Sequence, residues 1–157
     1  MIRIKAVDAQ NIFDVCELTA NKDGICKKTE EHFCCNAIFI AEAKFNPEMH
    51  PNAIYNNNVL IGFFMYLRAE NQADTAIICR FMIDYRFQHK GLGKKAFEYV
   101  LRGLKIQGVK KVILIIDDTN IIAEKLCLSC GFHFTGKTAH NEYRYKLEFN
   151  YSILKNH

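Results

Sequence analysis

Apolar and polar residues alternate with two different periods along this chain, and each change of period predicts the end of a helix or strand. Ile2–Val7 alternates apolar with charged residues, which is typical of a half-buried strand. Asp8 can cap a following helix, because its carboxylate accepts hydrogen bonds from the free N–H groups of a first turn. The apolar face of that predicted helix consists of Ile12, Phe13, Val15, Cys16 and Thr19.

A second helix is predicted from Lys28 to Phe45. Pro47 and Pro51 end it, because a residue that precedes proline avoids the helical conformation. The apolar residues that recur at helical spacing within it are Phe33, Ala37, Ile38, Ala41 and Phe45.

Three strands are predicted next. Ala53–Tyr55 and Val59–Leu67 flank Asn56–Asn58, a triplet that tolerates left-handed backbone and therefore predicts a hairpin. Thr75–Tyr85 is the third strand and is rich in Ile, Phe and Met.

The period then changes from that of a strand to that of a helix. Gly91–Gln107 is the predicted helix, and Gly108 ends it. Its buried residues are expected to be Leu92, Ala96, Phe97, Val100, Leu101 and Leu104. Val109–Ile116 follows as a nearly continuous aliphatic run, which predicts a strand covered on both faces.

The last third of the chain supplies one helix and two strands. Asp117–Thr119 can cap the helix, which ends at Cys130, and the strands are Phe132–Phe134 and Tyr143–Phe149. The resulting order is β-α-α-β-β-β-α-β-α-β-β. It predicts one α/β domain over residues 1–157, with a mixed sheet, helices on both faces and a candidate flexible tail at residues 150–157.

Composition narrows the function classes. The chain has 157 residues, of which 50% are hydrophobic and 24% charged, as in an ordinary globular domain. A net charge of +4 without a strongly basic stripe argues against nucleic-acid binding, and no apolar run predicts a membrane span. Seven free cysteines without a secretory signal predict a cytoplasmic protein. Cys127-x-x-Cys130 lacks the second pair that a zinc ribbon needs, so we expect no metal.

The segment that carries the most chemical information lies between the third central strand and the long helix. A loop with Gly91 and Gly93 opens that helix, where unpaired N–H groups and the positive end of the helix dipole favour a phosphate or pyrophosphate. The glycine spacing matches neither a Walker A loop nor a dinucleotide G-x-G-x-x-G. A connection with glycines for tight packing remains the alternative.

Two motifs resemble those of the GNAT superfamily of acyl-CoA N-acyltransferases. Gln88-x-x-Gly91-x-Gly93 is similar to its acetyl-CoA motif, and Asn120-x-x-Ala123 followed by Gly131-Phe132 is similar to its second one. The predicted order of elements agrees with that fold over nearly the whole chain. Three further segments resemble the spermine/spermidine (diamine) acetyltransferase branch: His50-Pro51-x-Ala53-Ile54-Tyr55, Ile61-Gly62-Phe63-x-Met65-Tyr66 and Arg80-Phe81-Met82-Ile83-Asp84-x-Arg86-Phe87-Gln88.

The resemblance implies a mostly antiparallel central sheet in which a bulge splays two strands apart to admit acetyl-CoA, and it implies a binding residue at each step along that co-substrate. Backbone N–H groups of Gln88, His89, Lys90, Gly91, Leu92, Gly93 and Lys94 would hold the pyrophosphate. The backbone of Phe81, Met82 and Ile83 would pair with the pantetheine arm, which Asn120 would also contact.

Catalysis by such an enzyme needs an oxyanion donor, a route for the amine proton and often a general acid. The resemblance assigns the first role to the N–H of Ile83 and leaves the last to Cys127, where many relatives have tyrosine. The alternative for Cys127 is a small buried side chain on the last helix. Cys79 stands where polyamine-type relatives are often acidic, which leaves Glu42 or Asp84 as candidate carboxylates.

The resemblance implies acetyl transfer to a primary amine by direct attack in a ternary complex, with a polyamine or other small cationic amine as the favoured acceptor. Glu30, Glu31, Glu42 and Glu48 could line the acceptor pocket or a solvated helix face. An amino acid, an antibiotic or a protein N-terminus stays open as acceptor, and so does a CoA-binding regulatory module without catalysis. Many relatives dimerise, so a homodimer is also an open alternative.

Overall fold

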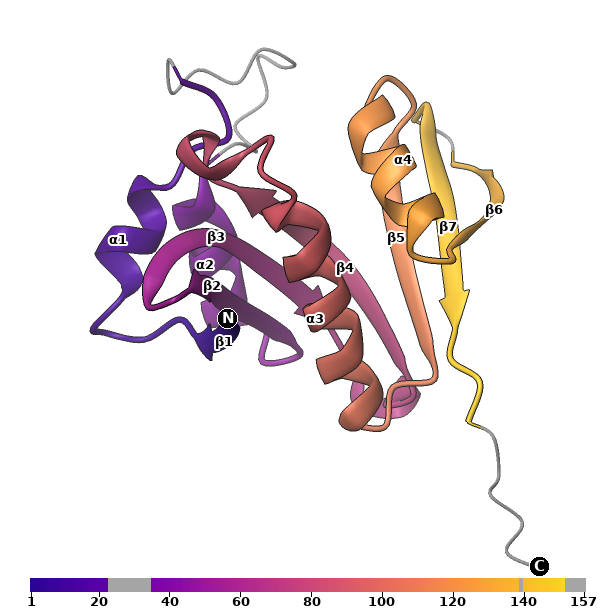
Figure 1. Cartoon of the computed structure of the whole chain (residues 1–157). Coiled ribbons are helices and arrows are strands. Elements are labelled where there is room, and N and C mark those ends of the chain that lie inside the picture. Colours follow the sequence, from indigo (N-terminus) through magenta and orange to yellow (C-terminus); the bar gives the residue numbers. More distant parts are fainter. Residues whose placement is uncertain (23–34, 139, 152–157) are drawn as a thin grey trace, which may run out of the picture.

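The computed structural model describes residues 1–22, 35–138 and 140–151 (Figure 1). Its strands are β1 (Ile2–Ala6), β2 (Met49–Asn56), β3 (Val59–Leu67), β4 (Thr75–Ile83), β5 (Lys111–Asp117), β6 (His133–Lys137) and β7 (Glu142–Glu148). Its helices are α1 (Ile12–Glu17), α2 (Asn36–Phe45), α3 (Leu92–Ile106) and α4 (Ile121–Ser129), with short 3-10 turns η1 (Glu70–Gln72) and η2 (Tyr85–Phe87). The predicted order of helices and strands is confirmed.

All seven strands form one sheet in the order β1-β2-β3-β4-β5-β7-β6. Neighbouring strands are antiparallel except β4 and β5, which are parallel and joined through α3. The hairpin between β2 and β3 turns at Asn57 and Asn58, both with the left-handed backbone that the asparagine triplet predicts. The mixed, mostly antiparallel sheet is therefore confirmed.

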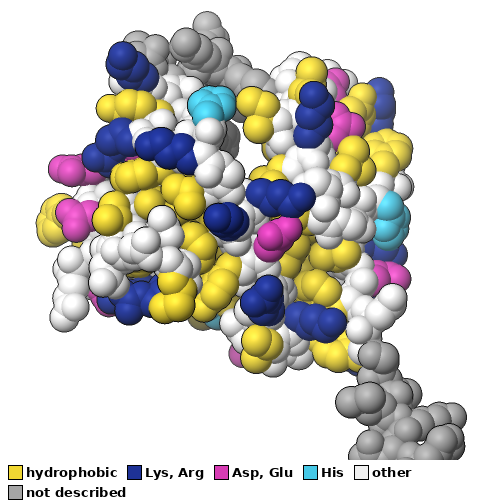
Figure 2. Space-filling model, in the orientation of Figure 1, with side chains coloured by type: hydrophobic (Ala, Val, Ile, Leu, Met, Phe, Trp, Pro, Cys, Tyr) yellow, Lys and Arg dark blue, Asp and Glu magenta, His cyan; other side chains and the backbone are white. Residues whose placement is uncertain are grey.

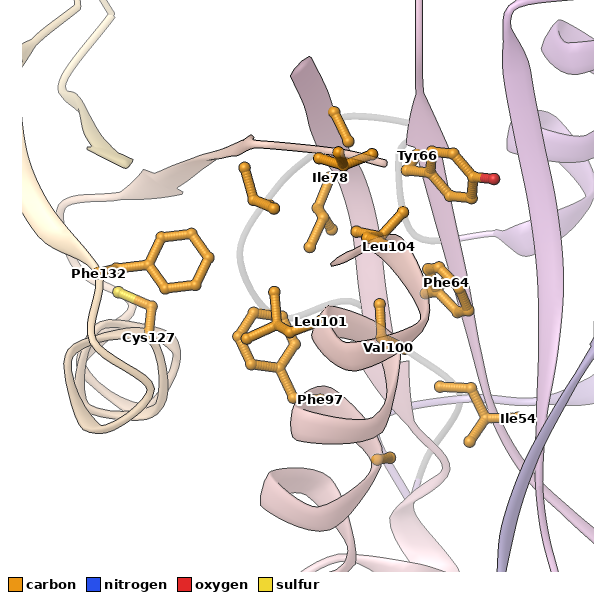
Figure 3. Close-up of a cluster of buried hydrophobic side chains, with 14 of the residues drawn as sticks. Ile54, Phe64, Tyr66, Ile78, Phe97, Val100, Leu101, Leu104, Cys127 and Phe132 are labelled. Atoms are coloured by element: carbon orange, nitrogen blue, oxygen red, sulfur yellow. The ribbon is translucent and has the colours of Figure 1, made fainter. Parts of the chain in front are cut away.

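Helices cover both faces of the sheet, as predicted. On one face, Phe97, Val100 and Leu104 of α3 pack on the central strands, and Cys127 of α4 lies across from them (Figure 3). On the other face, α1 and α2 contact a second apolar cluster built from β2, β3 and β4. Figure 1 shows α3 and α4 standing over different parts of the same sheet, α4 over β5 and β7.

The feature that positions the site is the divergence of β4 from β5. Their parallel pairing runs only from Thr75 opposite Lys111 to Ile78 opposite Leu114. Directly after Ile78, the pairing of β4 with β3 skips Cys79, which is the extra residue of a β-bulge. A bulge bends its strand, so the rest of β4 turns away from β5. Both the predicted bulge and the splayed strand pair are confirmed.

Three predictions about which side chains are buried are wrong. Phe13 is 82% exposed, and the buried residues of that region are Val15 and Leu18. Phe45 is 89% exposed and Ile38 41%, because α2 packs through Phe39, Ile40 and Ala43 instead. That helix is apolar on nearly every side, so its periodicity does not single out the face that the sheet covers.

The third error concerns β5, which is covered on both faces over only part of its length. Val112 and Ile116 are buried on the face that α3 and α4 cover. On the opposite face Ile113 is buried, but Ile115 is 43% exposed. The second apolar cluster, which includes α1 and α2, draws its strand residues from β2, β3 and β4. The predicted helix start at Lys28, with residues up to 34, and tail residues 152–157 lie outside the described residues. Within the described part of the chain, no helix has the length and apolar character that a membrane span requires.

Candidate active site

Asp84 anchors the turn that follows β4. Its buried carboxylate accepts hydrogen bonds from Arg86 Nε at 2.7 Å, from the Arg86 N–H at 3.0 Å and from the Thr19 N–H at 3.1 Å. Burial alone would raise the pKa of this carboxyl, but the bonds from Arg86 and Thr19 outweigh burial and hold the pKa below its ordinary value. Asp84 is thus a fixed, charged anchor, and these bonds disfavour it as the base that removes the amine proton.

Gln88 fixes the next part of the turn from inside. Its Nε2 donates to the carbonyls of Ala20 at 3.0 Å and Ile83 at 2.9 Å. Its backbone N–H donates to Tyr85 O at 3.4 Å and so is already engaged within the turn. Gln88 therefore holds the turn in shape, and the expected row of anion-binding N–H groups begins one residue later.

The N–H groups of residues 89–94 have no partner among the residues that the structure describes. Lys95 makes the first backbone hydrogen bond of α3, to Gly91 O at 3.3 Å, and no hydrogen bond within the described residues reaches the six N–H groups before it. His89 and Gly91 have left-handed φ angles of 58° and 71°, which bend the chain around this point. Unpaired N–H groups at the start of a 15-residue helix are a ready site for a phosphate.

Neither glycine of the turn is packed so tightly that a side chain would clash. A Cβ placed on Gly91 would meet no atom within 4 Å, and one on Gly93 would lie 3.7 Å from Ile83 Cγ1, an ordinary contact. The alternative explanation, glycines required for tight helix–strand packing, therefore loses its basis at Gly93. Close approach of a ligand to the backbone explains both positions better.

Positive side chains surround the turn without closing it. Lys90 Nζ donates to Arg86 O at 3.0 Å and lies 5.9 Å from the centre of the Phe87 ring. Figure 2 shows Lys and Arg side chains on this face of the molecule and a notch between the α3 and α4 halves. The field near the turn thus favours an anion.

The cleft between β4 and β5 contains a cavity of about 250 Å³. Its floor is the last pair of the parallel ladder, Ile78 and Leu114. The side chains and backbone around it come from β4, β5, α3 and α4, and they are Cys79, Arg80, Phe81, Phe97, Ile115, Ile116, Asp117, Asn120, Ala123, Leu126 and Cys127. The splayed strand pair that the resemblance implies therefore encloses a cavity.

Three of the predicted site residues meet in this cavity. Phe81 packs edge-on against Phe97 with ring centres 5.0 Å apart. Asn120 caps α4, because its Oδ1 accepts the Ala123 N–H at 3.2 Å, and its amide nitrogen is left for a ligand. Cys127 forms part of the α4 wall. The side chains of Met82 and Ile83 lie in the two apolar clusters, so only their backbone can face a ligand.

Cys127 is a poor proton donor in this position. The side chain is fully buried, and its Sγ donates to the Glu124 carbonyl at 3.2 Å. Burial raises the pKa of the thiol from 9.0 to about 11. A thiol that holds its proton so firmly gives it up to a departing thiolate only uphill, because an ordinary thiol has a pKa of about 8.5.

A polar contact near Cys127 was not predicted from the sequence. Tyr145 of β7 is 2% exposed, and its hydroxyl donates to Glu124 Oε1 at 2.9 Å. Burial, then the bond to Glu124, raises the pKa of Tyr145 to about 12. This contact fastens α4 to β7. It links residues 21 positions apart on two elements, which no local motif reveals.

The bulge at Cys79 faces α2. The Arg80 guanidinium lies 5.2 Å from the centre of the Phe39 ring, and Glu42 follows Phe39 by one helical turn. Burial raises the pKa of the Cys79 thiol, and the negative charge of Glu42 raises it further. Glu42 is therefore a carboxylate whose charge acts on the bulge. Among the described residues, no group of three or more His, Cys, Asp or Glu side chains could hold a metal ion.

Similarity to known proteins identifies the family to which the chain belongs. Residues 15–132 match the Acetyltransferase (GNAT) family. The chain belongs to the GNAT acetyltransferase family. It is thus an acyl-CoA-dependent N-acetyltransferase, as the two motifs predict.

Individual GNAT proteins are similar over nearly the full length. A spermine/spermidine N(1)-acetyltransferase from Bacillus subtilis is 30% identical over 146 residues, which cover 89% of this chain and 93% of that protein. The PaiA N-acetyltransferase from Thermoplasma acidophilum, solved in complex with coenzyme A, has a TM-score of 0.70 at 15% identity, covering 95% of this chain and 99% of that one. A spermidine N-acetyltransferase SpeG chimera from Vibrio cholerae and hSSAT has a TM-score of 0.72 at 15% identity, covering 94% and 95%.

Proposed function

We propose that this GNAT protein transfers the acetyl group of acetyl-CoA to a primary amine, and that the acceptor is a polyamine or other small cationic amine. The observation that carries the proposal is that the candidate phosphate site and the cavity lie along the same strand. The free N–H groups of residues 89–94 stand at one end of β4, and the cavity beside Phe81 follows the same strand to Ile78. A 30% identical relative with a polyamine acceptor favours the same substrate class.

Acetyl-CoA fits this site as an added strand. Its pyrophosphate accepts hydrogen bonds from residues 89–94, and its pantetheine arm runs along the backbone of Phe81, Met82 and Ile83 past Asn120. The stretch of β4 from Ile83 to Ile78 is about 17 Å long at 3.3 Å per residue. An extended pantetheine arm has a comparable length, so the thioester lies near the floor of the cleft.

The reaction is a direct acyl transfer. The nitrogen of the neutral amine attacks the thioester carbonyl carbon, a C–N bond forms, the C–S bond breaks, and coenzyme A leaves as a thiolate. The Ile83 N–H is the proposed donor to the oxyanion. The amine nitrogen becomes positively charged when it attacks, and the proton that it then loses goes to the thiolate, either directly or through water. Because Cys127 holds its own proton firmly, we assign it to the cavity wall in preference to the general-acid role.

Glu42 is the carboxylate that best suits a cationic acceptor. Asp84 is fully engaged by Arg86 and Thr19, and Glu48 accepts the Glu70 N–H at 3.0 Å. Glu30 and Glu31 lie outside the described residues. The Glu42 carboxylate has no hydrogen bond or ion pair to any residue that the structure describes, and it lies on the side of α2 that faces Cys79. An ammonium group at the bulge would provide its partner.

The decisive experiment is steady-state acetylation of a panel of acceptors. The release of free thiol measures the rate. Spermidine and 1,4-diaminobutane should have higher kcat/KM than an amino acid, an aminoglycoside or a peptide with a free N-terminus. Glu42→Gln should raise KM for the diamine about tenfold and leave KM for acetyl-CoA unchanged, because one charge-assisted contact contributes about 1.5 kcal/mol.

Glu48→Gln is the matched control, since it removes a carboxylate from the segment that follows the same helix and keeps an acceptor for the Glu70 N–H. Tight binding of CoA with no turnover on any amine would overturn the proposal in favour of a regulatory CoA-binding module. Turnover on peptides alone would replace the polyamine with a protein N-terminus.

A further inference from the structure

Helix α4 forms one wall of the cleft, but little of its own surface is buried. All nine of its residues are described, and Cys127 is the one that is buried. Ile121, Ile122 and Leu128 are exposed large apolar side chains. Figure 1 shows α4 over β5 and β7. The position of this wall therefore depends strongly on the few contacts that α4 makes with those strands.

Glu124 connects α4 to β7. Its Oε1 accepts a hydrogen bond from the buried Tyr145 hydroxyl at 2.9 Å. Its backbone N–H donates to the Asn120 carbonyl at 3.1 Å, and its carbonyl accepts from the Cys127 thiol at 3.2 Å. Glu124 thus links β7 to two residues that line the cavity, Asn120 and Cys127.

Glu124 and Tyr145 do not line the cavity themselves. The α4 residues that line it are Asn120, Ala123, Leu126 and Cys127. Asn120 lies one helical turn before Glu124, on the same side of α4, and its amide nitrogen is left for a ligand. A residue behind such a wall acts on a ligand through the residues that it holds in place.

We propose that Glu124 and Tyr145 are positioning residues for acetyl-CoA, because their hydrogen bond holds Asn120 at the place where the pantetheine arm passes. The inference rests on the proposed function, since it needs the co-substrate to run past Asn120. A hydrogen bond weakens steeply as its geometry worsens, so a small shift of α4 is enough to lose the contact of Asn120 with the arm. Water cannot readily replace the Tyr145 hydroxyl, because that side chain is 2% exposed.

The effect should be confined to one of the two substrates. Asn120 belongs to α4, on the face of the sheet that α3 also covers. Glu42, the proposed partner of the cationic acceptor, belongs to α2 on the other face. Loss of the bond between Glu124 and Tyr145 should therefore weaken binding of the co-substrate and leave binding of the amine unchanged.

Tyr145→Phe tests the proposal by removing the hydroxyl and keeping the ring. The Kd for CoA, measured by calorimetry, should rise about five- to tenfold, the equivalent of one hydrogen bond, and KM for 1,4-diaminobutane should stay the same. Glu124→Ala should have the same effect, and the double variant should lose no more affinity than either single variant. Glu124→Gln should bind CoA like the wild-type protein, because its amide oxygen can accept the same hydroxyl.

Tyr143→Phe is the matched control. It removes a hydroxyl from the same face of β7, where the ring packs edge-on against Phe134 of β6 with ring centres 5.5 Å apart. The Kd for CoA should not change in this variant. If Glu124→Ala fails to fold, Tyr145→Phe, Glu124→Gln and Tyr143→Phe still decide.

The outcomes separate this inference from the function on which it rests. A lower free energy of unfolding in Tyr145→Phe with an unchanged Kd for CoA would show a purely structural role and overturn the inference. An equal rise of KM for acetyl-CoA and for the diamine would also overturn it. Failure of the wild-type protein to bind CoA would instead overturn the proposed function.

Discussion

The two ends of the cleft between β4 and β5 are built in opposite ways. At the turn end, hydrogen bonds that Asp84 accepts and Gln88 donates fix the backbone, and the N–H groups of residues 89–94 have no partner among the described residues. At the floor, the packing of side chains such as Ile78 and Leu114 bounds the space. The turn thus offers backbone N–H groups to an anion such as a pyrophosphate, whereas the floor offers mainly side chains.

The largest effect should come from removing the anchor of the turn. Asp84→Ala leaves the N–H groups of Thr19 and Arg86 without their acceptor in a buried place, which should lower the free energy of unfolding by about 3 kcal/mol. Urea unfolding measures that loss, and titration with CoA should show a parallel loss of affinity.

Arg86→Ala is the matched comparison for this anchor. It removes the exposed partner and keeps both backbone hydrogen bonds to Asp84, so it should lower the free energy of unfolding by about 1 kcal/mol or less. Equal losses in the two variants would show that the ion pair, and not the buried backbone bonds, holds the turn.

Gly93→Ala should separate binding from folding. The added Cβ fits against Ile83 at 3.7 Å and replaces a poor helix former, so thermal stability should not fall. The same methyl group stands between the ligand and the free N–H groups, so CoA affinity measured by calorimetry should fall ten- to a hundredfold, the equivalent of one charge-assisted hydrogen bond. Unchanged affinity would remove the turn from the CoA site.

At the floor, the buried thiol of Cys127 should make stability depend on alkaline pH. Its pKa is raised on folding from 9.0 to about 11, so the folded state binds more protons than the unfolded state within that window, and stability falls as pH rises through it. Between pH 8 and pH 10 the free energy of unfolding in urea should fall by about 1 kcal/mol more for the wild-type protein than for Cys127→Ala. Parallel pH profiles would place the thiol in contact with water.

The smallest effect is expected from the charges around the turn. Lys94→Gln should weaken CoA binding only about threefold, because an exposed cation acts through solvent, and the difference should vanish near 1 M salt. Lys105→Gln, at the far end of α3, is the control. A larger, salt-independent loss at Lys94 would mean that its side chain, and not only the backbone, binds the phosphates directly.

The fold was predictable because each element carries its own local signal. Local patterns of apolar spacing and turn residues predict the apolar face of α3 with Gly108 after it, the asparagine turn and the order of the strands along the chain. Strand β2 shows where such signals stop. It begins at Met49 and runs through Pro51, because pairing with β1 and β3 extends it beyond the short run that its sequence predicts.

The candidate site was predictable for its backbone and less so for its side chains. The glycine spacing at Gly91 and Gly93 locates the turn, but the inward N–H of Gln88 depends on its contact with Tyr85. The burial of Cys127 depends on where α4 packs, and the bond between Tyr145 and Glu124 joins two elements that are distant in sequence. Such properties arise from tertiary packing, on which a single sequence carries no direct information.

The short ladder between β4 and β5 has a thermodynamic consequence. Backbone hydrogen bonds join the two strands only from Thr75 to Ile78. Beyond that narrow seam, the unit of β5, α4, β6 and β7 meets the rest through the apolar cluster that α3 and α4 share. A co-substrate that lies along β4 and contacts Asn120 touches both sides of that seam, so its binding would stabilise the contact between them. At a hundred times its dissociation constant, such a ligand would add about 2.7 kcal/mol to the stability of the whole chain. The melting temperature would then rise with the concentration of free CoA.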